Sequence, residues 1–504
     1  MKNDSLKLSY IFGLFILTSL LYNCSKNDDG PTENPEPTTL NDEVHDFVWS
    51  GLNEIYLWKD EVPNLADTKN DDQDAYFTFL NGYTSPETLF DALLYQKGTV
   101  DKFSFIVDDY VALENSFQGT SLSNGLDFGL VRLSNSDDIF GYVRYVANNS
   151  DAATKNIARG EFFLEVNGQQ LTLNNYQDLL FGSNTSYTLG MASITNGSIA
   201  TNGKTVALTK SEFTENPILI NKVIETSGSK IGYLMYNSFI ANFDQELNAA
   251  ILDLKTSGIT DLVLDLRYNP GGRVSSAIAL SSMITGQFNG EIFSREIWND
   301  RYQNFFLQNA PDRLINRFTD KLLDDTPINT LNLNKVYILT TSNSASASEL
   351  VINGLNAYIN VVQIGTNTTG KYTGSVTLYD SENFGKDGAN PNHTYALQPL
   401  VLKIANANGF TDYNDGLVPD HVITYNTSSG TAEGENLLDL GILGDETEPF
   451  LAKAIELITG STTKRNQTKS SGYTLPQVEF LNNSKDFSPI GREMYIGDFN
   501  KINP

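Results

Sequence analysis

KVYILTTSNSASASELVINGL, residues 335–355, joins a strand-like run to a helix-like segment through a serine-rich connection. Its opening residues, 335–341, form a run typical of a buried strand, and its closing residues have the pattern of a helix. Between the two, serines stand at every second position, namely Ser342, Ser344, Ser346 and Ser348. Such a connection is either a simple turn of small residues or the place where an α/β sheet presents a reactive side chain.

The chain around this stretch alternates strand-like and helix-like segments from residue 211 to residue 462. KIGYLMYNSF, DLVLDLRYNPGG and INVVQIG are strand-like. FDQELNAAILDLKTSG places Leu247, Ile251 and Leu254 on one face of a helix. This alternation predicts an α/β domain whose site lies at the ends of its strands.

Residues 41–112 are predicted to form a small helical module. In NDEVHDFVWSGLNEIYLW, apolar residues recur at helical spacing. In SPETLFDALLY, Ser85 is expected to cap a second helix. The apolar residues concerned are Val44, Phe47, Val48, Leu52 and Ile55 in the first segment, and Leu89, Leu93 and Leu94 in the second.

Residues 113–210 are predicted to be mostly β. A small-residue helix, then RGEFFLEVNGQ, a second short helix and a final strand together resemble a circularly permuted PDZ domain of the bacterial type. In such domains a loop before a strand offers N–H groups to a peptide carboxylate, and the peptide adds as a strand. The resemblance implies that this loop is Gly125, Leu126, Asp127, Phe128 and Gly129, where glycine allows close approach of an anion. A generic β-barrel module is the alternative.

The N-terminus has the features of an export signal. Residues 1–23 combine Lys2 and Lys7 with a mostly apolar run that is short for a membrane span. Cys24 is the sole cysteine, and its position at the end of the signal resembles a bacterial lipobox, so we expect lipidation there. Residues 24–40 are polar and proline-rich, as in a flexible tether. Residues 463–504 form a C-terminal tail without an evident role.

The composition limits the partners. The chain has 504 residues, of which 40% are hydrophobic and 19% charged, and its formal net charge is −27. A chain this acidic repels nucleic acid and anionic lipid, so we expect neither as a partner and expect membrane attachment only through the lipid anchor.

A reactive serine needs a base, and the residues leave two alternatives. The chain has three histidines, His45, His393 and His421, so a serine–histidine–aspartate set is possible, although no Gly-x-Ser-x-Gly turn accompanies it. The other base is a lysine that is neutral because an apolar pocket removes the hydration favouring its charge. Lys371, in TNTTGKYTG, fits that description.

SASASE with a later GK resembles the carboxy-terminal processing, or tail-specific, proteases of the S41 type, in the clan that includes tricorn. Their nucleophile lies three residues before the glutamate, which is Ser346 here, and their general-base lysine lies 25 residues further on, which is Lys371. DLRYNPGG, DGLVPD and the PDZ-like segment extend the resemblance over about residues 41–462. It implies an α/β multidomain protein with a helical N-terminal module, a PDZ-like β module and a crotonase-like or ClpP-like catalytic domain at 211–462, without cofactor or metal.

The residues around Ser346 fit this chemistry. The Ala347 N–H lies beside the nucleophile at a helix N-terminus and can donate to an oxyanion. Similarity to the family implies a second donor at Gly271 or Gly272. Glu349 is expected to cap the helix rather than act in the chemistry.

The sequence departs from the family after the lysine. Many relatives have glycine next and a lysine-orienting glutamine four positions on, where this chain has Tyr372 and Ser375. The group that orients Lys371 is therefore open. Arg267 is expected to brace the DLRYNPGG turn rather than touch substrate.

The sequence thus predicts a lipid-anchored serine endopeptidase of the bacterial cell envelope. It would use a Ser346–Lys371 dyad on polypeptides with free C-termini, which the PDZ-like module recognises. Two alternatives remain, a surface peptide-binding protein with a vestigial dyad and a serine esterase of the same fold.

Overall fold

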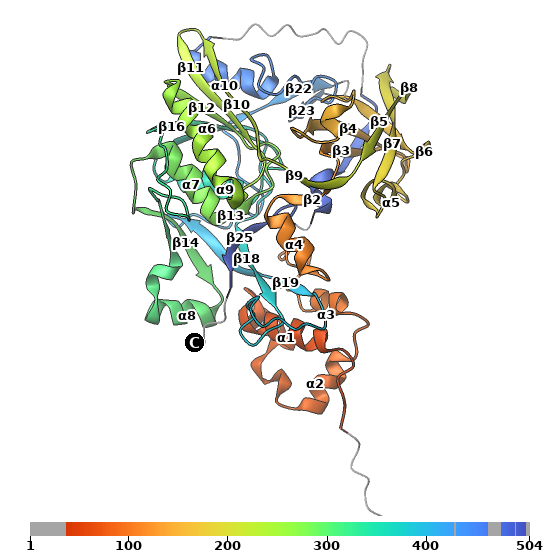
Figure 1. Ribbon diagram of the computed structural model, residues 1–504, viewed down its shortest axis with the longest axis vertical. Helices are drawn as coiled ribbons and strands as arrows, with labels where there is room; N and C mark the ends of the chain where they lie inside the picture. The colour runs from red at the N-terminus through yellow and green to blue at the C-terminus, as the bar shows by residue number, and fades with distance from the viewer. Residues whose placement is uncertain (1–36, 428–429, 462–474, 489, 500–504) are drawn as a thin grey trace, which may run out of the picture.

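The computed structural model describes residues 37–427, 430–461, 475–488 and 490–499 (Figure 1). The predicted signal peptide, the lipidation site Cys24 and most of the predicted tether lie outside the described residues. No helix within the described part combines the length and the apolar character needed to cross a membrane.

A six-stranded sheet lies at the centre of the α/β domain. Its order is β10-β11-β12-β16-β17-β21, and all neighbours are parallel except the β10–β11 hairpin. Alternation along β12 sends Leu262 and Leu264 to one face and Val263 to the other. The strands are β10 (Ile218–Thr226), β11 (Ser229–Tyr236), β12 (Asp261–Asp265), β16 (Lys335–Thr340), β17 (Asn360–Gly365) and β21 (His421–Val422).

Helices cover both faces of this sheet, as the alternating pattern predicts. Leu247, Leu280 and Leu350 place helices α6, α7 and α9 against the face of Leu262, whereas Phe450 places α10 against the opposite face. The helices are α6 (Asp244–Thr256), α7 (Val274–Thr285), α9 (Ala347–Asn356) and α10 (Pro449–Thr459).

A second, eight-stranded sheet joins the α/β domain to the N-terminal helices. Its main path is β1-β19-β18-β20-β14-β15, and β13 and β25 pair beside β18. Helix α8 (Asp300–Asn309) lies next to β14 (Figure 1). The strands are β1 (Phe105–Val107), β13 (Gly272–Arg273), β14 (Ile292–Trp298), β15 (Ile315–Arg317), β18 (Thr373–Tyr379), β19 (Ala396–Gln398), β20 (Leu400–Asn406) and β25 (Met494–Asp498).

The N-terminal part is helical. Asp42 caps α1 (Glu43–Ile55), whose five predicted apolar positions are all buried. Ser85 forms a capping box with Thr88 at the start of α3 (Pro86–Ala92), which buries Leu89 while Leu93 and Leu94 follow the helix end. The module is completed by α2 (Gln73–Leu80) and α4 (Tyr110–Phe117).

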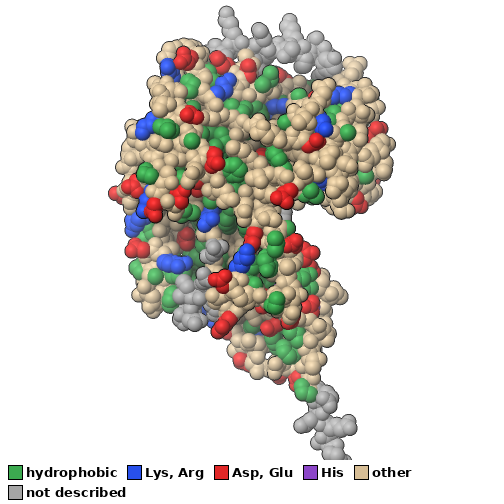
Figure 2. All heavy atoms as spheres, viewed as in Figure 1, with side chains coloured by type: hydrophobic (Ala, Val, Ile, Leu, Met, Phe, Trp, Pro, Cys, Tyr) green, Lys and Arg blue, Asp and Glu red, His purple; other side chains and the backbone are tan. Residues whose placement is uncertain are grey.

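The β module is a seven-stranded sheet with one short helix. Its order is β24-β3-β4-β5-β7-β8, and β6 pairs with β5. Figure 2 shows the molecular face hollowed between this module and the N-terminal helices. The elements are β3 (Leu126–Leu133), β4 (Ile139–Val146), β5 (Phe162–Val166), β6 (Gln169–Gln170), α5 (Tyr176–Phe181), β7 (Ser186–Thr195), β8 (Ser198–Thr209) and β24 (Val478–Asn483). A separate antiparallel pair, β2 (Thr120–Ser123) and β9 (Ser211–Thr214), joins the segments that enter and leave the module.

No role could be assigned to residues 463–504 from the sequence, but their described part contributes strands to two sheets, that of the β module and the eight-stranded sheet. Strand β24 pairs antiparallel with β3, and β25 pairs parallel with β13 and β18. Figure 1 shows this dark-blue segment running from the β module to the second sheet. We call residues 475–488 and 490–499 the C-terminal strap.

Candidate active site

Ser346 stands at the N-terminus of α9, directly after the loop that follows β16. Its backbone has φ 64° and ψ −116°, and positive φ is uncommon and strained for a residue other than glycine. Its side chain is fully buried, and its Oγ has no hydrogen-bond partner among the described residues. A strained, unpartnered hydroxyl beside a helix N-terminus is an arrangement typical of a catalytic position.

The neighbouring serines are engaged in holding the loop. Ser344 Oγ donates to the Leu266 carbonyl, 2.8 Å away, and Ser348 Oγ donates to the Asn269 carbonyl, 3.0 Å away. Ser342 is exposed. Of the four alternating serines, Ser346 therefore has the hydroxyl that is buried and free of competing bonds.

Glu349 joins the two predicted catalytic residues. One oxygen of its buried carboxylate accepts the main-chain N–H of Ser346 at 2.7 Å and that of Lys371 at 2.8 Å. The other oxygen accepts from Gly370 N–H and Thr368 Oγ1. Burial raises the pKa of Glu349 to about 7, and these donors oppose the rise. Glu349 thus caps α9, as expected, and also fixes the lysine loop beside it.

Lys371 lies two residues before the start of β18, and its side chain is fully buried. Its Nζ donates to the Arg492 carbonyl at 2.7 Å and to the Glu493 carboxylate at 3.2 Å. The Phe103 ring lies 5.0 Å from the same atom. Burial lowers the pKa of the Lys371 amine, while Glu493, Asp101 and Glu349 oppose that shift. The pocket therefore favours a neutral amine, and the carboxylates favour a charged one.

The group that contacts the Lys371 amine comes from the strap. The second carboxylate oxygen of Glu493 accepts from Ser375 Oγ, and Gln398 Nε2 donates to that hydroxyl at 2.8 Å. Burial raises the pKa of Glu493, opposed by Lys371 and Ser375. Sequence reasoning missed Glu493, because it lies 122 residues from Lys371 and no local pattern marks it.

Of the three predicted oxyanion donors, Gly271 packs against Ser346 and Ala347 follows it in the chain. Gly271 has φ 114°, and a Cβ there would lie 2.6 Å from Ser346 Cβ and 2.5 Å from the Glu493 carbonyl oxygen. Its N–H donates to Asn269 Oδ1, whereas the Gly272 N–H donates to the Glu493 carbonyl at 2.6 Å. Ala347 is the first residue of α9. Their role in binding an oxyanion stays a prediction.

The predicted peptide-binding residues 125–129 lie at the start of β3. Gly125 N–H donates to Ser123 Oγ, Leu126 N–H to Asn124 Oδ1 and Phe128 N–H to Ser484 Oγ of the strap. Gly129 is paired with Asn483 of β24. Buried Asp127 pairs with Arg144, whose Nη2 lies 3.0 Å from it. In this structure the N–H groups of Gly125, Leu126 and Phe128 therefore already donate hydrogen bonds within the chain.

The other predicted residues lie apart from the Ser346 hydroxyl. His45 is buried in α1, His393 bonds Asp380 at 2.9 Å, and His421 lies in β21. Arg267 is fully buried and binds Asp265 and Glu448, with its guanidinium over the Phe450 ring. Arg267 therefore holds the turn before Gly271 to α10. No cluster of His, Cys, Asp or Glu side chains suited to a metal ion occurs in the described ranges.

Residues 230–388 match the model of peptidase family S41, and residues 43–105 match that of the peptidase S41 N-terminal domain. A candidate S41 protease from Bacteroides fragilis has a similar crystal structure, with a TM-score of 0.62 and 25% identity, covering 82% of this chain and 97% of that one.

Two curated relatives are carboxy-terminal processing proteases. The one from Picosynechococcus is 25% identical over 257 residues, or 51% of each chain. The one from Bartonella bacilliformis is 29% identical over 293 residues, covering 55% of this chain and 56% of the relative. The matched region thus spans about half the length of these relatives.

The fold is therefore that of a multidomain α/β peptidase. Residues 230–388 carry a domain of peptidase family S41 and residues 43–105 an S41 N-terminal domain, and the chain is similar to carboxy-terminal processing proteases, which are serine peptidases.

Proposed function

We propose that the protein is a serine endopeptidase in which Ser346 attacks the peptide carbonyl and Lys371 accepts the Ser346 proton. The observation that carries this proposal is the single Glu349 oxygen that binds the main-chain N–H groups of both residues. It holds the backbones of Ser346 and Lys371, which lie on separate loops, beside each other, and this supports a pairing of the Ser346 hydroxyl with the Lys371 amine. The amine can act as a base because burial favours its neutral form.

The reaction that we propose is acyl transfer followed by hydrolysis. As the Ser346 oxygen bonds to the carbonyl carbon, its proton passes to Lys371 and then to the leaving amine. Water releases the acyl group. The Ala347 N–H, at the positive end of α9, is the donor best placed by chain position to stabilise the oxyanion, and such a donor commonly contributes about 3 kcal/mol.

The finer parts of the proposal concern substrate and location. We propose that residues 113–210 act as a PDZ-type module that binds polypeptide tails, and that the exported chain is anchored by lipid at Cys24. Turnover of a substrate with an amidated C-terminus should then be slower than turnover of the free acid. Incorporation of labelled palmitate should be lost in Cys24→Ser.

The test of catalysis is cleavage of casein and labelling by a serine-directed probe. Ser346→Ala should abolish both while leaving the fold intact, because it removes one small hydroxyl. Ser342→Ala is the matched control, since this exposed serine of the same loop should tolerate the change. Full activity of Ser346→Ala would show that the nucleophile is assigned incorrectly. Hydrolysis of simple esters without cleavage of casein would indicate an esterase.

A further inference from the structure

The strap occupies the open edge of the β module. From Val478 to Asn483 it pairs antiparallel with β3, so that Phe480 lies opposite Val131 and Asn483 opposite Gly129. A peptide that binds by adding a strand uses this kind of edge and takes its affinity from main-chain hydrogen bonds. The edge of β3 is therefore already filled by the chain itself.

An aromatic side chain of the strap fixes it to helix α5. The Phe487 ring stacks on Phe181 with centroids 3.9 Å apart and meets Tyr176 edge-on at 6.0 Å. Asn482 Nδ2 donates to the Tyr176 hydroxyl at 3.2 Å. Strand pairing on one side and an aromatic contact on the other are what an extended peptide makes in a groove between a strand and a helix.

The strap next contacts the loop that carries the nucleophile. Buried Asn483 accepts from Arg144 of the β module at 3.0 Å and donates to Asn343 at 2.9 Å. Lys485 Nζ donates to the carbonyls of Asn237 and Tyr268. These bonds link the groove at β3 directly to the serine loop and to the turn before Gly271.

Further along, the strap covers the candidate catalytic residues. The Arg492 carbonyl and the Glu493 carboxylate take the two hydrogen bonds of the Lys371 amine, and the Glu493 carbonyl takes the Gly272 N–H. Ser346 is fully buried. A substrate carbonyl cannot reach the hydroxyl while these groups hold their positions.

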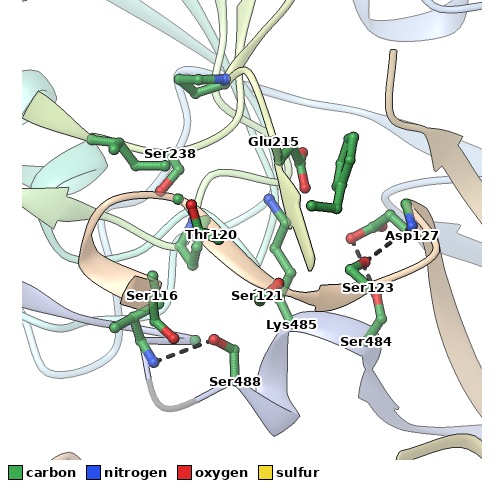
Figure 3. Close-up of a pocket in the computed structure, with 18 of the residues that line it drawn as sticks. Ser116, Thr120, Ser121, Ser123, Asp127, Glu215, Ser238, Ser484, Lys485 and Ser488 are labelled. Atoms are coloured by element: carbon green, nitrogen blue, oxygen red, sulfur yellow. Dashed lines mark hydrogen bonds between the residues drawn. The ribbon is translucent and has the colours of Figure 1, made fainter. Parts of the chain in front are cut away.

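The strap also forms walls of two hollows. A cavity of about 180 Å³ lies between Ser484, Lys485 and Ser488 of the strap and the β2–β3 region, and Figure 3 shows Lys485 extending toward Glu215 of the opposite wall. A groove of about 820 Å³ lies on the other side, between β1 and strap residues that include Phe487 and Glu493.

We infer that the groove between β3 and α5 is a peptide-binding surface whose resting ligand is the C-terminal strap of the same chain, and that a polypeptide substrate displaces the strap to reach Ser346. The ligand chemistry follows from the strap's own contacts. The ligand that fits this groove is an extended segment that pairs antiparallel with β3 and is followed by an aromatic residue that stacks on Phe181. The catalytic half of this inference rests on the proposed function of Ser346, whereas the binding half does not.

The test is a reversible lock. Arg132 and Glu479 lie directly opposite each other in the β3–β24 pair, and both side chains are partly or largely exposed. Directly opposed residues of antiparallel strands have Cα atoms about 4.5–5.5 Å apart, which suits a disulfide. The double variant Arg132→Cys, Glu479→Cys should hold the strap in place when oxidised and release it on reduction. Each single cysteine variant is a control.

Binding is measured first, in a Ser346→Ala background, with a labelled peptide LPQVEFLNNSKDFS that copies residues 475–488. The reduced double variant should bind it at least about tenfold more tightly than the oxidised one. In the oxidised form the disulfide keeps the strap paired with β3, so the peptide cannot take its place. The peptide with alanine at the Phe487 position should bind less tightly. Equal binding by both forms, or binding by neither, would overturn the inference.

Cleavage is measured next, with Ser346 present. Casein should be hydrolysed faster after reduction of the double variant, while the single variants should not respond. Equal hydrolysis before and after reduction would refute displacement of the strap and leave the peptidase function standing. Redox-dependent peptide binding without any hydrolysis would refute the peptidase function and leave the strap as the resting ligand.

Discussion

Replacing the carboxylate that binds the Lys371 amine should activate the enzyme. Glu493→Gln keeps the shape of the side chain but removes its charge. The substituted side chain can still accept from Lys371, whose Nζ lies 3.2 Å from the present carboxylate oxygen. If the strap is the resting ligand of the site, weakening this contact increases the fraction of molecules in which the site is open.

The magnitude follows from the kind of bond that is lost. A hydrogen bond involving charged groups contributes roughly 1.5–3 kcal/mol net, and one between neutral groups roughly 0.5–1.5 kcal/mol. The midpoints of these ranges differ by about 1.3 kcal/mol, which corresponds to a change of nearly tenfold in an equilibrium constant. We therefore expect the open population, and with it the rate at low substrate concentration, to rise about tenfold.

The same substitution should shift the pH profile. Burial lowers the pKa of Lys371, and Glu493 is the strongest of the groups opposing that shift, ahead of Asp101 and Glu349. Without the Glu493 charge the pKa falls further, so the neutral base appears at lower pH. The rising limb of activity should move to lower pH in Glu493→Gln.

The assay is initial-rate hydrolysis of casein across a pH series, with Glu479→Gln as the matched control. Glu479 is an exposed strap residue whose pair with Arg132 is 3.8 Å long, and exposed pairs of this kind contribute about 0–1 kcal/mol. A loss of kcat in Glu493→Gln with unchanged KM would refute the reasoning. Glu493 would then be a positioning residue for Lys371 rather than part of a competing ligand.

Three further substitutions test the remaining parts of the site. Lys371→Arg should be inactive at every pH although it keeps a positive charge, because guanidinium does not lose its proton in proteins. The wild-type rate should rise on one limb as pH passes through the lowered pKa of Lys371 and then level off. An active Lys371→Arg enzyme would return the three histidines to consideration as the base. Glu349→Gln should lower kcat and destabilise the fold by about 1–3 kcal/mol, since an amide nitrogen would face main-chain N–H groups; wild-type kcat and an unchanged urea midpoint would contradict the bridging role of Glu349. Arg267→Met should lower the free energy of unfolding by about 3–5 kcal/mol, because Asp265 and Glu448 would keep buried charges without the guanidinium that pairs with them; a urea midpoint equal to that of the exposed-pair variant Arg317→Met would disprove it.

The α/β domain could be predicted from the sequence because the patterns that mark its strands and helices are local. Periodicity along residues 261–265 and 335–340 marks buried strands, and helical spacing marks α1 and α6. Ser346 and Lys371 could be selected because their spacing within one segment matches that of the tail-specific proteases that the sequence resembles. That they form a dyad stays a prediction until the variants are measured.

The strap could not be predicted, because its role depends on contacts between distant parts of the chain. VEFLNN, the sequence of β24, is short, and its Phe480 is 60% exposed, so no buried face marks it as a strand. Ser375 stands where a glutamine would orient the lysine, and the contact to the amine instead comes from Glu493. Nothing in the local sequence of either residue indicates the other.

The bridging position of Glu349 has a mechanical consequence. Ser346 begins a helix and Lys371 precedes a strand of the other sheet, so thermal shifts between those two layers would ordinarily change the spacing of nucleophile and base. One carboxylate oxygen binds the backbone of both, and therefore a displacement of either loop pulls the other along with it. When the strap leaves and the layers around the site readjust, the pair should travel as a single unit, and the distance over which the proton must pass should be preserved.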